Sequence, residues 1–141
     1  MGDGVANDAA AVQAALDSGA KKVLIKDAIC GIGSPLTVPG GVVLEAEGGS
    51  LKALSAKTGV LDTRGTHVFL GARSWLKNVE ILPPEGAFTW AGLINTIVRC
   101  LGDHAKVTGC KIDVTGSSVL KADGLAGISV FTAFDHCLIE E

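Results

Sequence analysis

The chain has 141 residues, of which 48% are apolar and 19% charged, and its formal net charge is −3. This length and composition predict one folded domain with a hydrophobic core and exclude a disordered chain. The sequence has no basic cluster and no apolar run of bilayer-spanning length, which argues against nucleic acid as a partner and against a membrane span.

The first structural signal is a short helix within residues 2–19. Asn7 and Asp8 are good residues for a helix start, and the alanine-rich stretch 9–16 favours helix. An apolar face is expected from Val12, Ala15, Leu16 and Gly19, and Gly19 also predicts the end of the helix. Such a short helix needs a surface to cover, and the open end of a stack of strands is a suitable one.

Three strands are predicted next. In residues 21–32, Val23 and Ile25 alternate with Leu24 and Lys26, and a break follows at Asp27. Residues 34–41 contain two prolines and two glycines and read as turn, short strand, turn. In residues 42–48 the pattern predicts one buried face and one solvent-exposed face; the buried face consists of Val42, Leu44 and Ala46.

These opening residues resemble the start of the pectate lyase superfamily (pectin lyase-like proteins). The likeness lies in the stretches GDGVANDAAAVQAALDSG, KKVLI and SPLTVPGGVVLEAEGG and covers about the first 50 residues. The matching positions are Gly2, Asp3, Gly4, Val5, Asp8, Gln13, Ala14, Ala15, Pro35, Leu36, Pro39, Gly41, Val42, Leu44 and Gly48. Asn7 and Ala46 depart from the family pattern, which often has Asp and Gly there.

The resemblance implies an all-β fold, a right-handed single-stranded parallel β-helix (solenoid) with a short N-terminal capping α-helix. Residues 1–20 would form the capping turn and helix, and residues 21–141 would form the coils of the same single domain. The coils would be incomplete at the C-terminal end, as expected of the N-terminal part of a longer protein.

A repeated six-residue pattern supports stacked strands independently. It starts at Leu76, Val107 and Phe134, at intervals near those of solenoid repeats. The third position of each copy, Asn78, Gly109 or His136, is expected at a bend, followed by a Val or Cys and an Ile that point inward. This register would stack Cys110 and Cys137 under Val79, and a reduced pair is favoured over a disulfide. The four cysteines Cys30, Cys100, Cys110 and Cys137 match no zinc spacing and are expected to be small buried hydrophobes.

Candidate catalytic groups are few. Glycosidases need two carboxylates, and polysaccharide lyases need a base and a cation that stabilises an enolate. Asp103 and His104 are the candidate catalytic acid/base pair, although a solvated turn is the favoured reading of these two residues. Asp62 with Arg64 and Asp135 with His136 are weaker candidates that also fit turns, and Glu140 and Glu141 cannot be assigned. Asp3 is expected to cap a turn.

Trp75 and Trp90 could stack on sugar rings, but packing in a core or between subunits is the commoner role for tryptophan.

The resemblance implies the N-terminal part of a polysaccharide-degrading or polysaccharide-binding protein, of phage tailspike or depolymerase type, in a virion or outside the cell. Expected partners are a bacterial surface polysaccharide and further copies in a homotrimer, or other virion or cell-surface subunits. No cofactor is expected, except calcium for a lyase. The alternatives are a non-catalytic structural module and a secreted pectinase-type enzyme.

Overall fold

The computed structural model describes residues 2–54, 68–82, 96–112, 126–130 and 138–140. These residues form short strands and one helix. In chain order the elements are β1 (Asp3–Asn7), α1 (Ala9–Asp17), β2 (Lys22–Lys26), β3 (Ile29–Ile32), β4 (Leu36–Val38), β5 (Val43–Glu47), β6 (Ser50–Ala53), β7 (Val68–Leu70), β8 (Trp75–Lys77), β9 (Glu80–Leu82), β10 (Thr96–Cys100), β11 (Lys106–Thr108), β12 (Lys111–Ile112), β13 (Ala126–Val130) and β14 (Leu138–Glu140).

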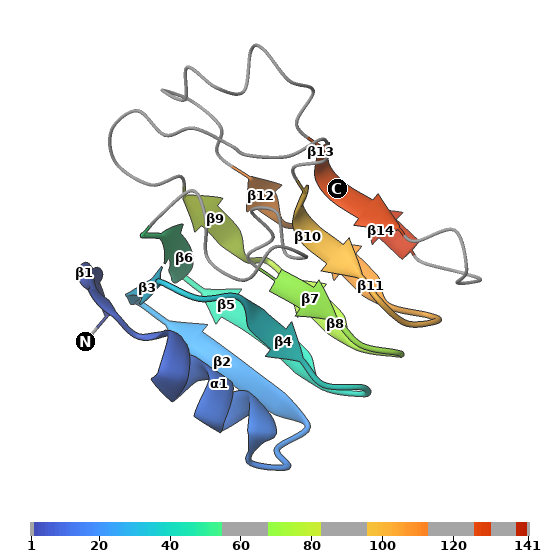
Figure 1. The fold of residues 1–141 in the computed structure, drawn as a ribbon, viewed down its shortest axis with the longest axis horizontal. Coiled ribbons are helices and arrows are strands. Elements are labelled where there is room, and N and C mark those ends of the chain that lie inside the picture. Colours follow the sequence, from blue (N-terminus) through green and yellow to red (C-terminus); the bar gives the residue numbers. More distant parts are fainter. Residues whose placement is uncertain (1, 55–67, 83–95, 113–125, 131–137, 141) are drawn as a thin grey trace.

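The strands form three parallel sheets (Figure 1). Sheet one has the order β1-β3-β6-β9-β12, sheet two β2-β5-β8-β11-β14, and sheet three β4-β7-β10-β13. The predicted right-handed solenoid is corrected by this finding: the structure consists of three distinct parallel sheets and one short helix, in a small domain. Recurring apolar positions predict which strands pair, but they leave the path of the connections open.

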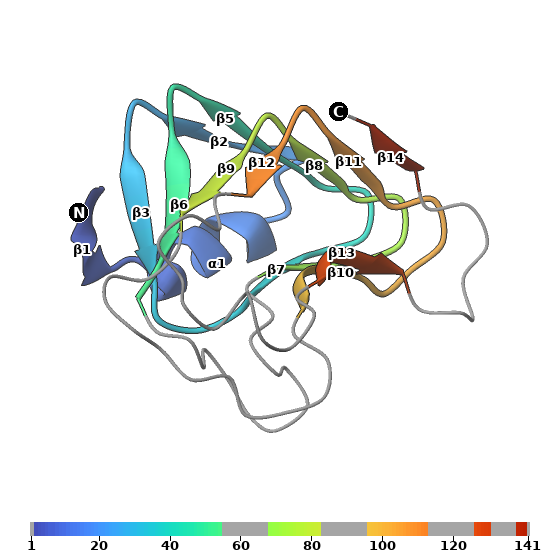
Figure 2. The same cartoon turned by 90° about the horizontal axis from the view of Figure 1, so that it is seen from above.

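One hydrophobic core lies between the sheets. Each sheet turns alternate residues toward it; in sheet two these include Leu44, Leu76 and Val107, which are at most 1% exposed. Figure 1 shows α1 at one end of the stacked strands, and Figure 2 shows it within the outline of the three sheets; it contacts β2, β3 and β4. None of the described helical segments has the length and hydrophobicity to cross a membrane.

The helix is confirmed, but its buried face differs from the prediction. Ala9, Val12 and Leu16 are buried, whereas Ala15 and Gly19 are exposed. The three buried residues lie at spacings of three and four, so they share one face of the helix. Gly19 does adopt a left-handed conformation, with a φ of 84°.

The prediction for the helix start is confirmed for Asn7 and wrong for Asp8. The side-chain oxygen of Asn7 accepts the Ala9 N–H at 3.2 Å, whereas Asp8 makes no capping bond. The Asp8 carboxylate instead accepts the N–H groups of Gly2 and Gly31, at 3.1 and 3.3 Å. It therefore connects the chain before the helix to β3.

The repeated pattern is confirmed in two of its three copies. Leu76 pairs with Val107, and both predicted bend residues have a positive φ, 53° at Asn78 and 60° at Gly109. The third copy is wrong, because Val107 pairs with Ile139 and not with Phe134. Phe134, Leu138 and Ile139 are all apolar and could each take the inward position opposite Val107, and only the pairing itself chooses between them.

The prediction of buried cysteines is confirmed for Cys100 and in part for Cys30 and Cys110. Cys100 is fully buried, whereas Cys30 and Cys110 are half-buried free thiols that pack against the core. Burial raises the pKa of the Cys30 and Cys110 thiols. Cys137 lies outside the described residues, so its predicted stacking on Cys110 stays a prediction, and the corrected register of β14 no longer supports it.

Candidate functional site

The most distinctive surface of the described structure is the outer face of sheet two around Trp75. Residues that alternate with the buried Leu44, Leu76 and Val107 point outward here. In the strand register Trp75 lies beside Lys106, and Lys77 lies between Glu45 and Thr108. We name this surface the tryptophan face; it consists of Lys22, Glu45, Trp75, Lys77, Lys106 and Thr108.

Two lysines flank the half-buried indole of Trp75. The Nζ atom of Lys77 lies 5.2 Å from the centroid of the indole ring, and the Nζ atom of Lys106 lies 5.6 Å from it. Both distances are within the range of cation–π attraction. The indole Nε1 donates a hydrogen bond of 2.7 Å to Oγ1 of Thr108, which holds the ring in one orientation on the sheet.

Glu45 extends this arrangement toward β2. Its carboxylate accepts from Nζ of Lys22 at 2.5 Å and from Nζ of Lys77 at 3.0 Å. Hydrogen bonds from Lys22 and then Lys77 lower the pKa of Glu45 below its ordinary value. Lys77 therefore interacts with both Glu45 and Trp75, and the one carboxylate of the tryptophan face is held between two ammonium groups.

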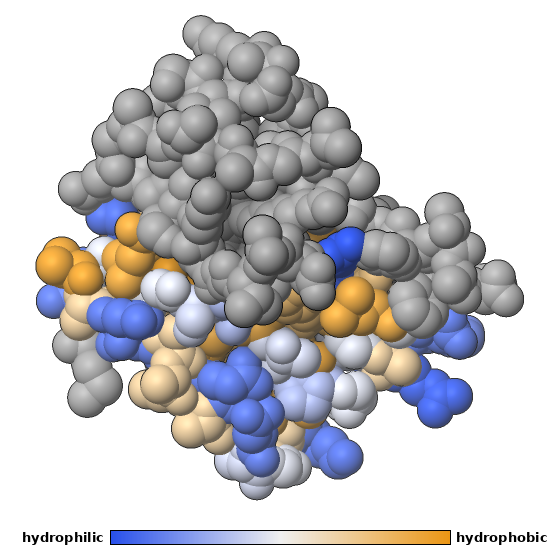
Figure 3. Space-filling view, in the orientation of Figure 1, coloured by the Kyte–Doolittle hydropathy of each residue, from blue (hydrophilic) through white to orange (hydrophobic). Residues whose placement is uncertain are grey.

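This set of groups suits an anionic ligand with an apolar surface. An indole can pack against the C–H face of a sugar ring, while lysine ammonium groups can donate to carboxylates. The tryptophan face holds three lysines against one glutamate, so its charge is positive although the whole chain has a net charge of −3. Figure 3 shows hydrophilic and hydrophobic residues interspersed over the described part of one side of the molecule.

The predicted catalytic candidates lie elsewhere, in the turn between β10 and β11. Asp103 and His104 are both exposed, and His104 has a φ of 60°. The Asp103 carbonyl accepts the Arg73 N–H at 2.8 Å, so this turn stacks on the turn between β7 and β8. Their catalytic role stays a prediction, and the two residues are not part of the tryptophan face.

The remaining candidates divide into described and undescribed residues. Asp3 caps a turn as predicted, because its Oδ1 accepts the N–H groups of Val5 and Ala6 at 2.9 and 3.1 Å. These hydrogen bonds lower the pKa of Asp3. The candidates outside the described residues are Asp62, Arg64, Trp90, Asp135, His136 and Glu141, and Glu140 is described only as part of β14.

A calcium ion for a lyase reaction finds no matching site in the described ranges. No group of three or more His, Cys, Asp or Glu side chains is positioned there to hold a metal ion. The acidic group of the tryptophan face, Glu45, is already held by two lysines. We therefore derive no step through calcium.

The residues around Trp75 were missed by the sequence analysis, although a signal for them existed. Once Leu76 and Val107 are aligned, their neighbours Trp75 and Lys106 must share one outward row. The same alignment places Lys77 beside Thr108. Placing Glu45 and Lys22 on this face required the structure, since no repeat identified from the sequence aligns β2 or β5 with β8.

Comparison with known proteins gave no match: no family model, no curated protein and no solved structure is significantly similar to this chain.

Proposed function

We propose that the tryptophan face binds an acidic polysaccharide of a bacterial surface. The observation that carries this proposal is the half-buried Trp75 with two lysine ammonium groups 5.2 and 5.6 Å from its ring centroid. A sugar ring would stack on the indole edge or face, and a uronate or similar carboxylate would pair with Lys77 or Lys106. The likeness of residues 2–48 to a superfamily of polysaccharide-acting proteins supports the same class of ligand.

The sheet provides the rigid support that such a site needs. Trp75 and Lys106 lie on adjacent paired strands, with Leu76 and Val107 buried beneath them. The indole orientation is held by Thr108 before any ligand arrives. Binding would therefore require little reordering of the protein beyond the lysine side chains.

The test measures binding of the 141-residue chain to a panel of bacterial capsule and O-antigen polysaccharides by titration calorimetry. A uronic-acid polymer and dextran serve as the acidic and neutral references. We expect binding to acidic polymers only, with an affinity that falls as salt is added. Trp75→Ala should weaken binding by about tenfold or more, whereas Trp75→Phe should retain most of it.

Fluorescence provides a second readout. The chain has two tryptophans, so a Trp90→Phe background makes Trp75 the sole indole reporter. A ligand on the tryptophan face should shift its emission. Equal affinity for acidic and neutral polymers, or unchanged binding by Trp75→Ala, would overturn the proposal.

A second candidate is a non-catalytic structural module of a phage tail or cell-surface assembly. It is favoured by the internal pairing of the tryptophan face, where Glu45 is held by Lys22 and Lys77 and the indole N–H is held by Thr108. This candidate predicts that no polysaccharide of the panel binds. Sedimentation of the same sample tests the expected homotrimer.

A further inference from the structure

Three strands lie at the end of their sheets on the side of α1: β1, β2 and β4. An exposed sheet edge presents unpaired backbone groups that can recruit another chain. Two of these edges are blocked. At β4, the Gln13 side chain takes up both the N–H and the C=O of Thr37. At β1, the Asp3 carboxylate accepts the N–H groups of Val5 and Ala6.

The edge of β2 is different. The Lys21 carbonyl accepts from Val43, and the Asp27 N–H donates to Glu47, so the odd-numbered residues of this segment bond to β5. In a strand, the backbone groups of alternate residues point to opposite sides. The N–H and C=O groups of Lys22, Leu24 and Lys26 therefore point away from β5, and no hydrogen bond within the described structure joins them to another segment.

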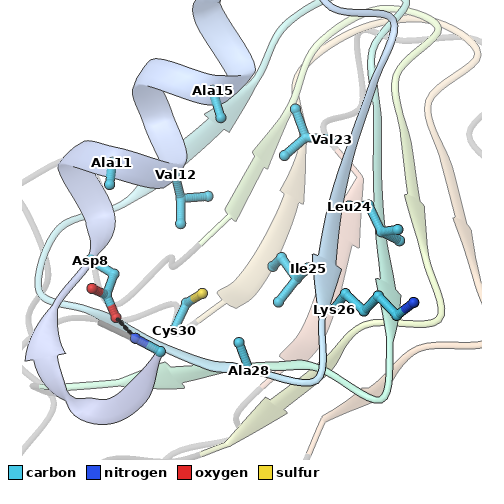
Figure 4. A pocket seen from close by; sticks show the side chains of 11 residues that line it. Asp8, Ala11, Val12, Ala15, Val23, Leu24, Ile25, Lys26, Ala28 and Cys30 are labelled. Atoms are coloured by element: carbon cyan, nitrogen blue, oxygen red, sulfur yellow. Dashed lines mark hydrogen bonds between the residues drawn. The ribbon is translucent and has the colours of Figure 1, made fainter.

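An apolar groove of about 440 Å³ lies beside this edge. Figure 4 shows α1 forming one wall, with Val12 and Ala15, and β2 forming the other, with Val23 and Ile25. Leu24 is 41% exposed at the same place, an unusual position for a large apolar side chain in this structure. The backbone edge and the groove together provide what an added strand needs, hydrogen-bonding partners and pockets for its side chains.

The charges beside the edge restrict what can bind there. Lys22 and Lys26 stand at the two ends of β2. Lys22 pairs with Glu45 but keeps its side chain 53% exposed, and the structure as described shows no ion pair for Lys26. A second copy pairing through its own β2 would bring lysines close to lysines in either direction, which disfavours self-association. A segment with acidic residues would instead meet opposite charges.

We infer that the edge of β2 binds an extended, acidic segment of a partner protein by β-strand addition. Backbone hydrogen bonds to Lys22, Leu24 and Lys26 would hold the segment, and its apolar side chains would enter the groove between α1 and β2. Lysines are also a common means of discouraging strand pairing, so the experiment must separate attraction of an acidic strand from protection of an unused edge.

The probe is a fluorescein-labelled seven-residue peptide of alternating valine and glutamate, and the control peptide has lysine in place of glutamate. We expect the acidic peptide to bind and the basic one to bind at least about tenfold more weakly. Amide hydrogen exchange should slow at Lys22, Leu24 and Lys26 on binding, and it should change little at Val23 and Ile25, which already bond to β5. This alternation is specific to strand addition at this edge.

Two variants test the geometry. Leu24→Pro removes an N–H that points away from β5 and makes no hydrogen bond to it. The fold should therefore persist, while peptide binding should be lost. Leu24→Thr keeps the N–H and serves as the matched control. Lys26→Glu should reverse the preference between the two peptides. The inference is overturned if the acidic peptide does not bind, or if Leu24→Pro binds it as well as the parent does. It is also overturned if the amides of Lys22, Leu24 and Lys26 become protected from exchange as the protein concentration rises without peptide, because a second copy would then be the occupant.

Discussion

The side chain of Gln13 binds the backbone of Thr37 in both directions. Its Nε2 donates to the Thr37 carbonyl at 3.0 Å, and its Oε1 accepts the Thr37 N–H at 2.8 Å. A neighbouring strand would offer the same donor and acceptor, so one glutamine of α1 replaces the missing strand at the edge of β4. This contact links the first helix to sheet three.

The first prediction concerns this contact. Gln13→Ala should destabilise the chain by about 1–2 kcal/mol, because both hydrogen bonds to Thr37 are lost together. Urea unfolding measures the effect, and the Thr37 amide should exchange faster. Asp17→Ala is the matched control, since it removes only the bond from Gln13 Nε2 to the Asp17 carboxylate. Equal stability of Gln13→Ala and the parent would show that water replaces the side chain without loss.

The second prediction concerns the bend that follows sheet two. Gly109 has a φ of 60°, and a Cβ added there would clash with Oδ1 at the end of the exposed Asn78 side chain. Gly109→Ala should destabilise the chain by about 1–2 kcal/mol through backbone strain, plus a smaller cost for turning the Asn78 side chain aside. Gly41→Ala isolates that strain, because Gly41 has a φ of 75° and open space around its Cβ position. The double variant Asn78→Gly/Gly109→Ala should lose this second cost. Its melting temperature in thermal unfolding should therefore be closer to that of Gly41→Ala than the melting temperature of Gly109→Ala is.

The third prediction is a pH dependence. The folded chain lowers the pKa of Glu45 through Lys22 and Lys77. The ionised carboxylate therefore favours folding above the ordinary value of 4.5, and this contribution is lost as the pH falls toward the lowered pKa. Glu45→Gln should lose less stability than the parent between about pH 5 and pH 3.

Glu80→Gln is the control for that measurement. Glu80 pairs with Lys111 at 2.8 Å, but its side chain is 37% exposed against 12% for Glu45. An exposed ion pair contributes little, so this variant should follow the acid unfolding curve of the parent. Identical curves for Glu45→Gln and the parent would argue against a stabilising role of the two lysines.

The fourth prediction separates the two lysines that flank Trp75. Lys106→Gln should weaken polysaccharide binding with little change in stability. Lys77→Gln should weaken binding and also lower stability at neutral pH, because Lys77 has a second partner in Glu45. Calorimetric titration and urea unfolding of the same samples give both quantities. An equal effect of the two variants on both would contradict the assigned division of roles.

The local elements could be predicted from short stretches of the sequence. The helix within 9–17, the strand break at Asp27 and the bends at Asn78 and Gly109 all follow from short-range propensity and from residues that tolerate a positive φ. It also predicted the pairing of Leu76 with Val107, since two copies of one pattern align without ambiguity. These features depend on residues that are close together in the chain or that occupy matching positions of a repeated pattern.

The strand register and the contacts between distant segments emerged only from the folded chain. It placed Ile139 beside Val107 against the expected register, and it arranged the strands as three parallel sheets with one helix in place of the expected solenoid. It also brought Glu45 between Lys22 and Lys77, and Gln13 to Thr37. Strand register and contacts between distant segments depend on the loop paths and on competition among similar apolar residues, and neither is encoded in a local pattern.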